Sequence, residues 1–144
     1  MVSKAKERLH KEIRDEAERT ARQLRGKFNM GSRDIGDIFR FIEQSLNYLL
    51  IRKSFGSEAL DGFAAIYQGE RLVVTNSSHI LSREKFTAAH EIGHHYFDFK
   101  DESNDELIAD QQTGCFDQQN LAEFRADCFA AALLMPKEGV EDAY

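Results

Sequence analysis

The sequence predicts a single α+β domain, mainly helical, with a small antiparallel three-stranded sheet. A chain of 144 residues is long enough for one hydrophobic core but not for two. Stretches near both ends are rich in helix-forming residues with apolar side chains at helical spacing. Between them lie three short runs rich in β-branched and aromatic residues, bounded by turn residues.

Residues 4–27 favour helix throughout, and their apolar stripe of Leu9, Ile13, Ala17 and Leu24 is thin. Such a stripe is too narrow for a helix in the centre of a core. We expect this helix to dock on the body of the domain. Pairing with a second copy and contact with another protein are the alternatives.

A second, well-buried helix is expected after the break at residues 29–32. Its N-cap is expected at Ser32 or Asp34, because both side chains can accept hydrogen bonds from free amide groups of a first turn. Apolar side chains follow at helical spacing: Ile35, Ile38, Phe39, Ile42 and Leu46.

Three strands are predicted next, at Tyr48–Phe55, Phe63–Gln68 and Arg71–Thr75. The last two flank Gly69 and Glu70. A two-residue loop with glycine first predicts a hairpin with a type II′ turn.

The segment from His90 to His94 reads H-E-x-x-H. On a helix, residues four apart share a face, so both imidazoles can reach one metal ion. Glu91 lies beside the first histidine and can act as general base on a water molecule. The helix is expected to have Ser82 as its N-cap and Phe86 facing the core.

A third ligand is expected from residues 121–136, which read as a buried, Ala- and Leu-rich helix that ends at Pro136. Glu123 and Asp127 share one face of it, and a carboxylate pair on a buried helix favours a bound cation. Glu123 can complete a His-His-Glu set, and Asp127 can accept a hydrogen bond from a ligand imidazole. His95 is rotated by about 100° from His94, so we expect it at the surface or behind the ligands.

Residues 85–94 and 123–136 together resemble the ImmA/IrrE family of metallopeptidases. The family pattern is an F-T-x-A-H-E-x-G-H helix followed by an E-x-x-A-[ND]-x-F-A-A-x-L-L-M-P helix. The resemblance implies a minimal zincin-like peptidase core with His90, His94 and Glu123 as ligands. It also implies that Glu91 is the general base and that Asp127 occupies the family's Asp or Asn position.

The function implied by the resemblance is a zinc endopeptidase that cuts a helix-turn-helix transcriptional repressor in a stress or mobile-element response. Zinc is the default for two imidazoles and a carboxylate, and manganese is possible. Candidate contacts to the oxyanion or the substrate are Tyr96, His79 and Arg125. Metallopeptidases bind extended substrate along a sheet edge, so we expect one strand to border the cleft.

Two alternative functions would use the same candidate metal-site residues. One is a metal-stabilised interaction module, related to toxin–antitoxin or phage proteins, with little or no peptidase activity. The other is a metallohydrolase acting on a non-peptide substrate. A general base has no use in a binding module, so Glu91 between the ligands favours an enzyme.

Composition limits the partners. The net charge of −6 combines a local +4 in residues 1–28 with −10 in the remainder, which argues against direct nucleic-acid binding. No apolar run approaches a membrane span and the start of the chain is not signal-like, so we expect a cytoplasmic protein. Two cysteines do not indicate a disulfide framework.

The expected domain, 1–144, divides into a charged N-terminal helix (1–28), a helix with a small sheet (33–81) and the metal-site helices (82–136), and its oligomeric state is left open.

Overall fold

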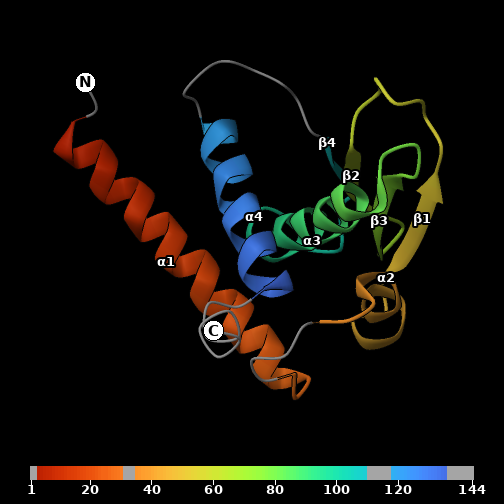
Figure 1. Cartoon of the computed structure of the whole chain (residues 1–144), viewed down its shortest axis with the longest axis horizontal. Coiled ribbons are helices and arrows are strands. Elements are labelled where there is room, and N and C mark those ends of the chain that lie inside the picture. Colours follow the sequence, from red (N-terminus) through yellow and green to blue (C-terminus); the bar gives the residue numbers. More distant parts are fainter. Residues whose placement is uncertain (1–2, 31–34, 110–117, 136–144) are drawn as a thin grey trace.

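A computed structural model describes residues 3–30, 35–109 and 118–135, and the α+β class is confirmed. Figure 1 shows the helices gathered on one side of a twisted sheet. The elements in chain order are α1 (Lys4–Lys27), α2 (Ile38–Arg40), the π-helix η1 (Phe41–Ser45), β1 (Leu49–Lys53), β2 (Gly62–Tyr67), β3 (Glu70–Asn76), α3 (Leu81–Phe97), β4 (Glu106–Ala109) and α4 (Gln118–Leu134).

Helix α1 has the predicted bounds and docks along α4, as expected (Figure 1). The Ser3 hydroxyl caps it by accepting from the amide of Lys6 at 3.1 Å. Ala17 and Ala21 are fully buried, because small side chains let the two helix backbones approach each other. At its C-terminal end, the buried Arg25 guanidinium donates to the carbonyl of Leu133 and so ties α1 to the last turn of α4.

The predicted second helix is present, but it begins only at Ile38 and consists of α2 followed directly by η1. Asp37 is its cap, because the Asp37 carboxylate accepts from the amides of Phe39 and Arg40 at 3.0 and 3.2 Å. The candidate caps Ser32 and Asp34 lie outside the described residues. The α-helix then continues as the wider π-helix η1, whose side chains Phe41 and Ile42 pack in the core.

The sheet is mixed and has four strands in the order β1-β3-β2-β4. The three predicted strands are all present and the β2–β3 hairpin is antiparallel as predicted, whereas the fourth strand and the parallel direction of β1 were not predicted. Strand β1 runs parallel to β3, whereas β2 is antiparallel to both β3 and β4. The physical reason is the long β1–β2 connection, which passes round the end of β3 and lets β3 insert between the two strands. Strand β4 is only four residues long and lies in an acidic segment, where the alternation signal is too short to be read.

The β2–β3 turn lies one residue earlier than predicted. Tyr67 pairs with Glu70, so the turn residues are Gln68 and Gly69. Their φ angles are 51° and 79°, which is the pattern of a type I′ turn and not of type II′.

Helix α3 is the centre of the domain: one side packs on β2 and β3, and another packs on α4 (Figure 1). It begins at Leu81, so Ser82 lies inside the helix and is not its cap. The cap position is Ile80, which makes no side-chain capping bond. Phe86 is 37% exposed and does not face the core, because it lies one turn before His90 on the helix face that lines the cavity described below.

No helix among residues 3–30, 35–109 and 118–135 is long and apolar enough to span a membrane.

Gly62 shows how tightly α3 sits on the sheet. A Cβ atom there would lie 2.3 Å from the carbonyl oxygen of Val74 and 2.8 Å from Cγ2 of Thr87 on α3. We therefore expect Gly62→Ala to lower the free energy of unfolding by about 1–3 kcal/mol, measured by urea denaturation. Gly26→Ala on α1 is the control, since nothing lies within 4 Å of its Cβ position, and it should raise stability by about 0.5–1 kcal/mol. Equal effects of the two substitutions would contradict the packing argument.

Candidate metal centre

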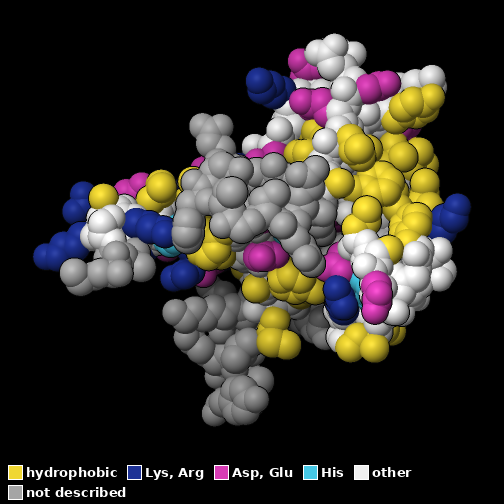
Figure 2. All heavy atoms as spheres, turned by 90° about the horizontal axis from the view of Figure 1, so that it is seen from above, with side chains coloured by type: hydrophobic (Ala, Val, Ile, Leu, Met, Phe, Trp, Pro, Cys, Tyr) yellow, Lys and Arg dark blue, Asp and Glu magenta, His cyan; other side chains and the backbone are white. Residues whose placement is uncertain are grey.

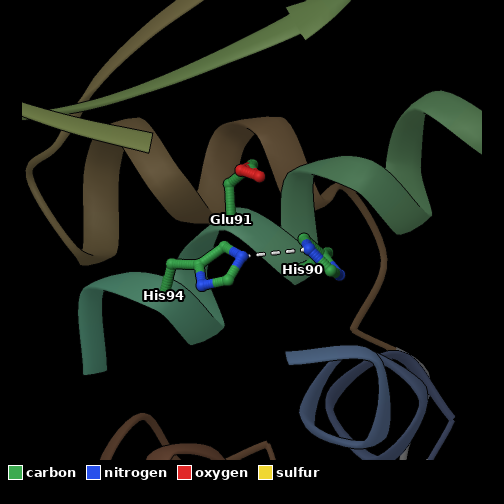
Figure 3. Close-up of side chains that lie close together, drawn as sticks. All are labelled: His90, Glu91 and His94. Atoms are coloured by element: carbon green, nitrogen blue, oxygen red, sulfur yellow. Dashed lines mark hydrogen bonds between the residues drawn. The ribbon is translucent and has the colours of Figure 1, made fainter. Parts of the chain in front are cut away.

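His90 and His94 project from one face of α3, and their Nε2 atoms lie 3.1 Å apart (Figure 3). His90 is 6% exposed and His94 fully buried. Together with Glu91 they place one ligand-type atom each within 4.8 Å of one another. The i,i+4 spacing read from the sequence therefore does bring both imidazoles to one point.

Glu123 reaches the same point from α4. Its carboxylate oxygens lie 2.8 Å from Nε2 of His90 and 3.1 Å from Nε2 of His94. The two helices are close enough for this because of Gly93, where a Cβ atom would lie 3.2 Å from the Cα of Ala126. The glycine between the histidines thus allows the carboxylate of α4 to reach both of them.

The Nδ1 atom of each imidazole, on the other side of the ring from Nε2, contacts a carboxylate. Nδ1 of His90 is 2.7 Å from Asp127 Oδ1, and Nδ1 of His94 is 2.7 Å from Asp98 Oδ2. A carboxylate can only accept, so each Nδ1 carries the hydrogen, a tautomer assigned from these partners. The lone pairs of both Nε2 atoms then face each other and the carboxylate of Glu123. Such an all-acceptor arrangement needs a cation in its centre.

The donor set fits a divalent metal ion such as zinc. Two imidazole nitrogens and one carboxylate are a known catalytic zinc set, and tetrahedral bonds of about 2.1 Å would place ligand atoms roughly 3.4 Å apart. The separations of 2.8–3.1 Å between these atoms need only a small expansion. The Nδ1–carboxylate bonds are the support that such ligands usually have.

The electrostatics also favour a cation. Burial lowers the pKa of His94, but the carboxylates of Asp98 and Glu123 outweigh it and raise that pKa to about 9. Burial raises the pKa of Glu123, but hydrogen bonds with His90 and His94 outweigh it and hold that pKa well below its usual range. A proton occupies this place when no metal does, so metal binding has to release it.

Glu91 leaves α3 beside the two imidazoles and is fully buried (Figure 3). Glu91 follows His90 directly in the sequence. In the fold, its carboxylate lies in one cluster with the imidazoles of His90 and His94. A carboxylate at this place can exchange a proton with a water molecule next to the imidazole Nε2 atoms.

A cavity of about 590 Å³ opens on the metal-centre residues. His90, Glu123 and Asp127 form its floor, and Phe86 and Thr87 continue it along α3. Residues 57–61, which precede β2, form the opposite wall, so the described lining comes from this loop and not from a strand as expected.

The loop wall is anchored by Asn76, a residue that the sequence did not mark. Its amide nitrogen donates to the carbonyls of Gly56 and Leu60 at 2.8 and 3.1 Å, and its oxygen accepts from the amide of Phe55 at 3.2 Å. Asn76 is fully buried. Nothing local distinguishes an asparagine at a strand end from a solvated one, so only the fold shows this role.

His79 supports the same wall from behind. Its Nε2 donates to the carbonyl of Ser57 at 3.1 Å, and its Nδ1 lies 3.3 Å from the Asp61 carboxylate. Ser57 and Asp61 line the cavity, whereas His79 is not among the lining residues of the described chain.

Arg125 and Tyr96 also lie away from the described cavity lining. The Arg125 guanidinium donates to Asp98 at 2.9 Å and to Glu16 of α1 at 3.1 Å. Arg125 is therefore linked to His94 through Asp98, which bonds to both of them. Tyr96 is 40% exposed and stacks on Phe129, with ring centroids 5.9 Å apart.

His95 is buried, and not at the surface as one expectation had it. Its Nε2 donates to the carbonyl of Leu72 at 2.7 Å, which links α3 to β3. Burial lowers its pKa to about 4, so the ring is neutral.

Asp98, which bonds to His94, is a second residue of the site that sequence reasoning missed. It lies four residues after His94, on the same helix face, so a search for carboxylates one turn from each histidine would have found it.

The family comparison agrees with this geometry. The sequence model of the peptidase family M78, described as IrrE N-terminal-like domain, matches residues 43–144, which is 102 of the 144 residues. The match includes α3 and α4 with the metal-centre residues, and α1 precedes it. No curated protein matches the chain. The chain therefore belongs to the M78 peptidase family, with an IrrE N-terminal-like domain that contains the candidate metal centre.

Proposed function

We propose that this protein is a zinc-dependent endopeptidase, in which His90, His94 and Glu123 hold the metal and Glu91 is the general base. The observation that carries the proposal is the meeting of both Nε2 atoms with the Glu123 carboxylate at 2.8–3.1 Å. Membership of a peptidase family supports hydrolysis of a peptide bond as the chemistry. Manganese is the alternative metal for the same ligands.

The metal, when bound, supplies a Lewis acid that polarises the scissile carbonyl and acidifies water. Glu91 takes the proton of the attacking water and delivers it to the amide nitrogen of the departing segment as the C–N bond breaks. Because Glu91 is fully buried, its carboxylate exchanges the proton locally and not with bulk solvent. Asp127 and Asp98 keep the imidazoles in the tautomer whose Nε2 lone pairs would bind the metal.

The substrate enters through the cavity between residues 57–61 and α3. Its volume of about 590 Å³ suits a short segment of extended chain with a few side chains, which is typical of an endopeptidase cleft. The ImmA/IrrE resemblance of residues 85–94 and 123–136 supports a helix-turn-helix repressor as the substrate, cut once in a stress or mobile-element response.

The general base is tested by Glu91→Gln. We expect this variant to bind zinc as the wild type does but to lose about 10²–10⁴-fold in the rate of cleavage. The substrate is a helix-turn-helix repressor encoded beside the protease, and the readout is one new fragment by mass spectrometry. Cleavage at the wild-type rate would contradict the mechanism, whereas intact repressor with the wild-type enzyme would contradict the substrate assignment.

The third ligand is tested by Glu123→Ala. We expect at least about tenfold weaker zinc binding, measured by competition with a chromophoric chelator, because one of three protein ligands is lost. Glu58→Ala is the matched control, since Glu58 lines the same cavity but has no contact with either Nε2 atom among the described residues. Unchanged zinc affinity of the Glu123 variant would remove this residue from the ligand set.

The support behind His94 is tested by Arg125→Gln. Loss of the guanidinium removes a partner of Asp98, and we expect about tenfold weaker zinc binding, measured under conditions in which circular dichroism shows both variants to be folded. Asp15→Asn on α1 is the control, because it breaks the exposed Lys11–Asp15 pair at 3.4 Å and leaves the metal centre alone. Equal zinc affinities of the two variants would show that Arg125 does not position the ligand.

A further inference from the structure

One face of the sheet points away from the helices, and we call it the outer face. Its residues follow from the alternation of side chains along each strand. Thr75 and Arg52 both bond to Glu84 of α3, so they point to the inner face. Val74 and Ile51 are their neighbours and therefore point outward.

The outer face is apolar in continuous rows. Pairing places Leu49 beside Leu72, and in the next row Ile51 beside Val74. The rows continue through Ala65 and Leu107, and through Phe63 and Ala109. Figure 2 shows hydrophobic side chains gathered over the sheet, at the end of the molecule away from α1. The most exposed members are Leu49 (50%), Ile51 (44%), Tyr67 (57%) and Leu107 (65%).

This composition differs from that of a sheet with one solvated face. Such a sheet alternates apolar and polar residues, whereas strands covered on both sides are apolar on both. Here the inner face contributes Leu50, Val73, Ala64 and Ile108 to the packed core, beside the polar Arg52 and Thr75. The outer face is also apolar; Val74 and Ala65 are already buried within the single chain, and the residues around them are the exposed part of this face. The helices of the described chain lie on the inner side (Figure 1). The outer face therefore has the character of an interface.

Two charges on this face indicate what covers it. Within the described strands, its charged side chains are Lys53, at the C-terminal end of β1, and Glu70, at the start of the neighbouring β3. Because β1 and β3 are parallel, these charges stand at opposite ends of the face. Turning a second copy about a two-fold axis across the strands brings each Lys53 over the Glu70 end of the other copy. Packed sheets lie about 10 Å apart, a distance that these two side chains span together.

We infer that two copies of this chain associate face to face through the outer face, with their strands antiparallel. This inference is independent of the metal chemistry proposed above. Four strands about 4.8 Å apart and up to seven residues long give a face of roughly 400 Å². That is about half of the ~800 Å² per partner in a typical specific interface, so the dimer should be weak and reversible.

The experiment is analytical ultracentrifugation of the full chain from about 1 μM to about 1 mM. We expect a reversible monomer–dimer equilibrium, with half-dissociation at roughly 10 μM to 1 mM. Leu49→Glu should weaken dimerisation by about 30-fold or more, because it places a charge in an apolar contact. Leu9→Glu on α1 is the matched control, since Leu9 is exposed to a similar degree at 42%, and it should leave the equilibrium unchanged. A monomer at all concentrations, or equal effects of the two substitutions, would overturn the inference.

Charge reversal tests the antiparallel geometry. Lys53→Glu and Glu70→Lys should each weaken the dimer by about three- to tenfold, because each pair occurs twice in the symmetric interface. The double variant should restore the wild-type constant. Thermal denaturation and zinc content of each variant show whether the fold is retained. A double variant as weak as the singles would overturn the inference in this form.

Discussion

Three acceptor groups that face one another and share the place of a single cation determine the design of this domain. The Nε2 atoms of His90 and His94 and the carboxylate of Glu123 meet within 2.8–3.1 Å, while each Nδ1 hydrogen is already donated to another carboxylate. Such a cluster would repel itself if it held no cation. The fold therefore has to hold α3 and α4 at a fixed, short distance so that a proton or a metal ion can neutralise their facing groups.

The rest of the structure maintains that distance from two sides. The sheet holds α3 through Gly62, through the Arg52–Glu84 pair at 2.7 Å and through the His95 bond to β3. Helix α1 holds α4 through buried alanines and the Arg25 bond to its last turn. A further link runs from Glu16 through Arg125 and Asp98 to His94. Helix α1 precedes the part of the chain that matches the family, yet it contacts the residues behind the metal centre.

The two walls of the cavity are built differently. The imidazoles and carboxylates lie on two long helices, whereas the opposing wall of the cavity is a loop held by Asn76 and His79. Rigid helices suit a cluster whose atoms have to stay within a few tenths of an ångström. A loop can vary in length and sequence without moving the proposed metal ligands, which suits the wall that we propose contacts the substrate.

The sequence by itself determined the bounds of α1, the α+β class and the presence of two motif helices, because helical periodicity and i,i+4 spacing are local properties. It also pointed to Glu123 and Asp127 as candidate site residues, since the two carboxylates lie one turn apart on the same face of an apolar helix. Only the tertiary structure decided the strand order, the parallel direction of β1, the place of the β2–β3 turn and the positions of Arg125 and His79. These depend on contacts between residues far apart in the chain, where loop length and packing override local preference. The candidate ligands and Asp127 could be proposed from the sequence because their spacing follows the helical repeat, whereas the links through Asp98, Arg125 and Glu16 join α3, α4 and α1 and appear only in the fold.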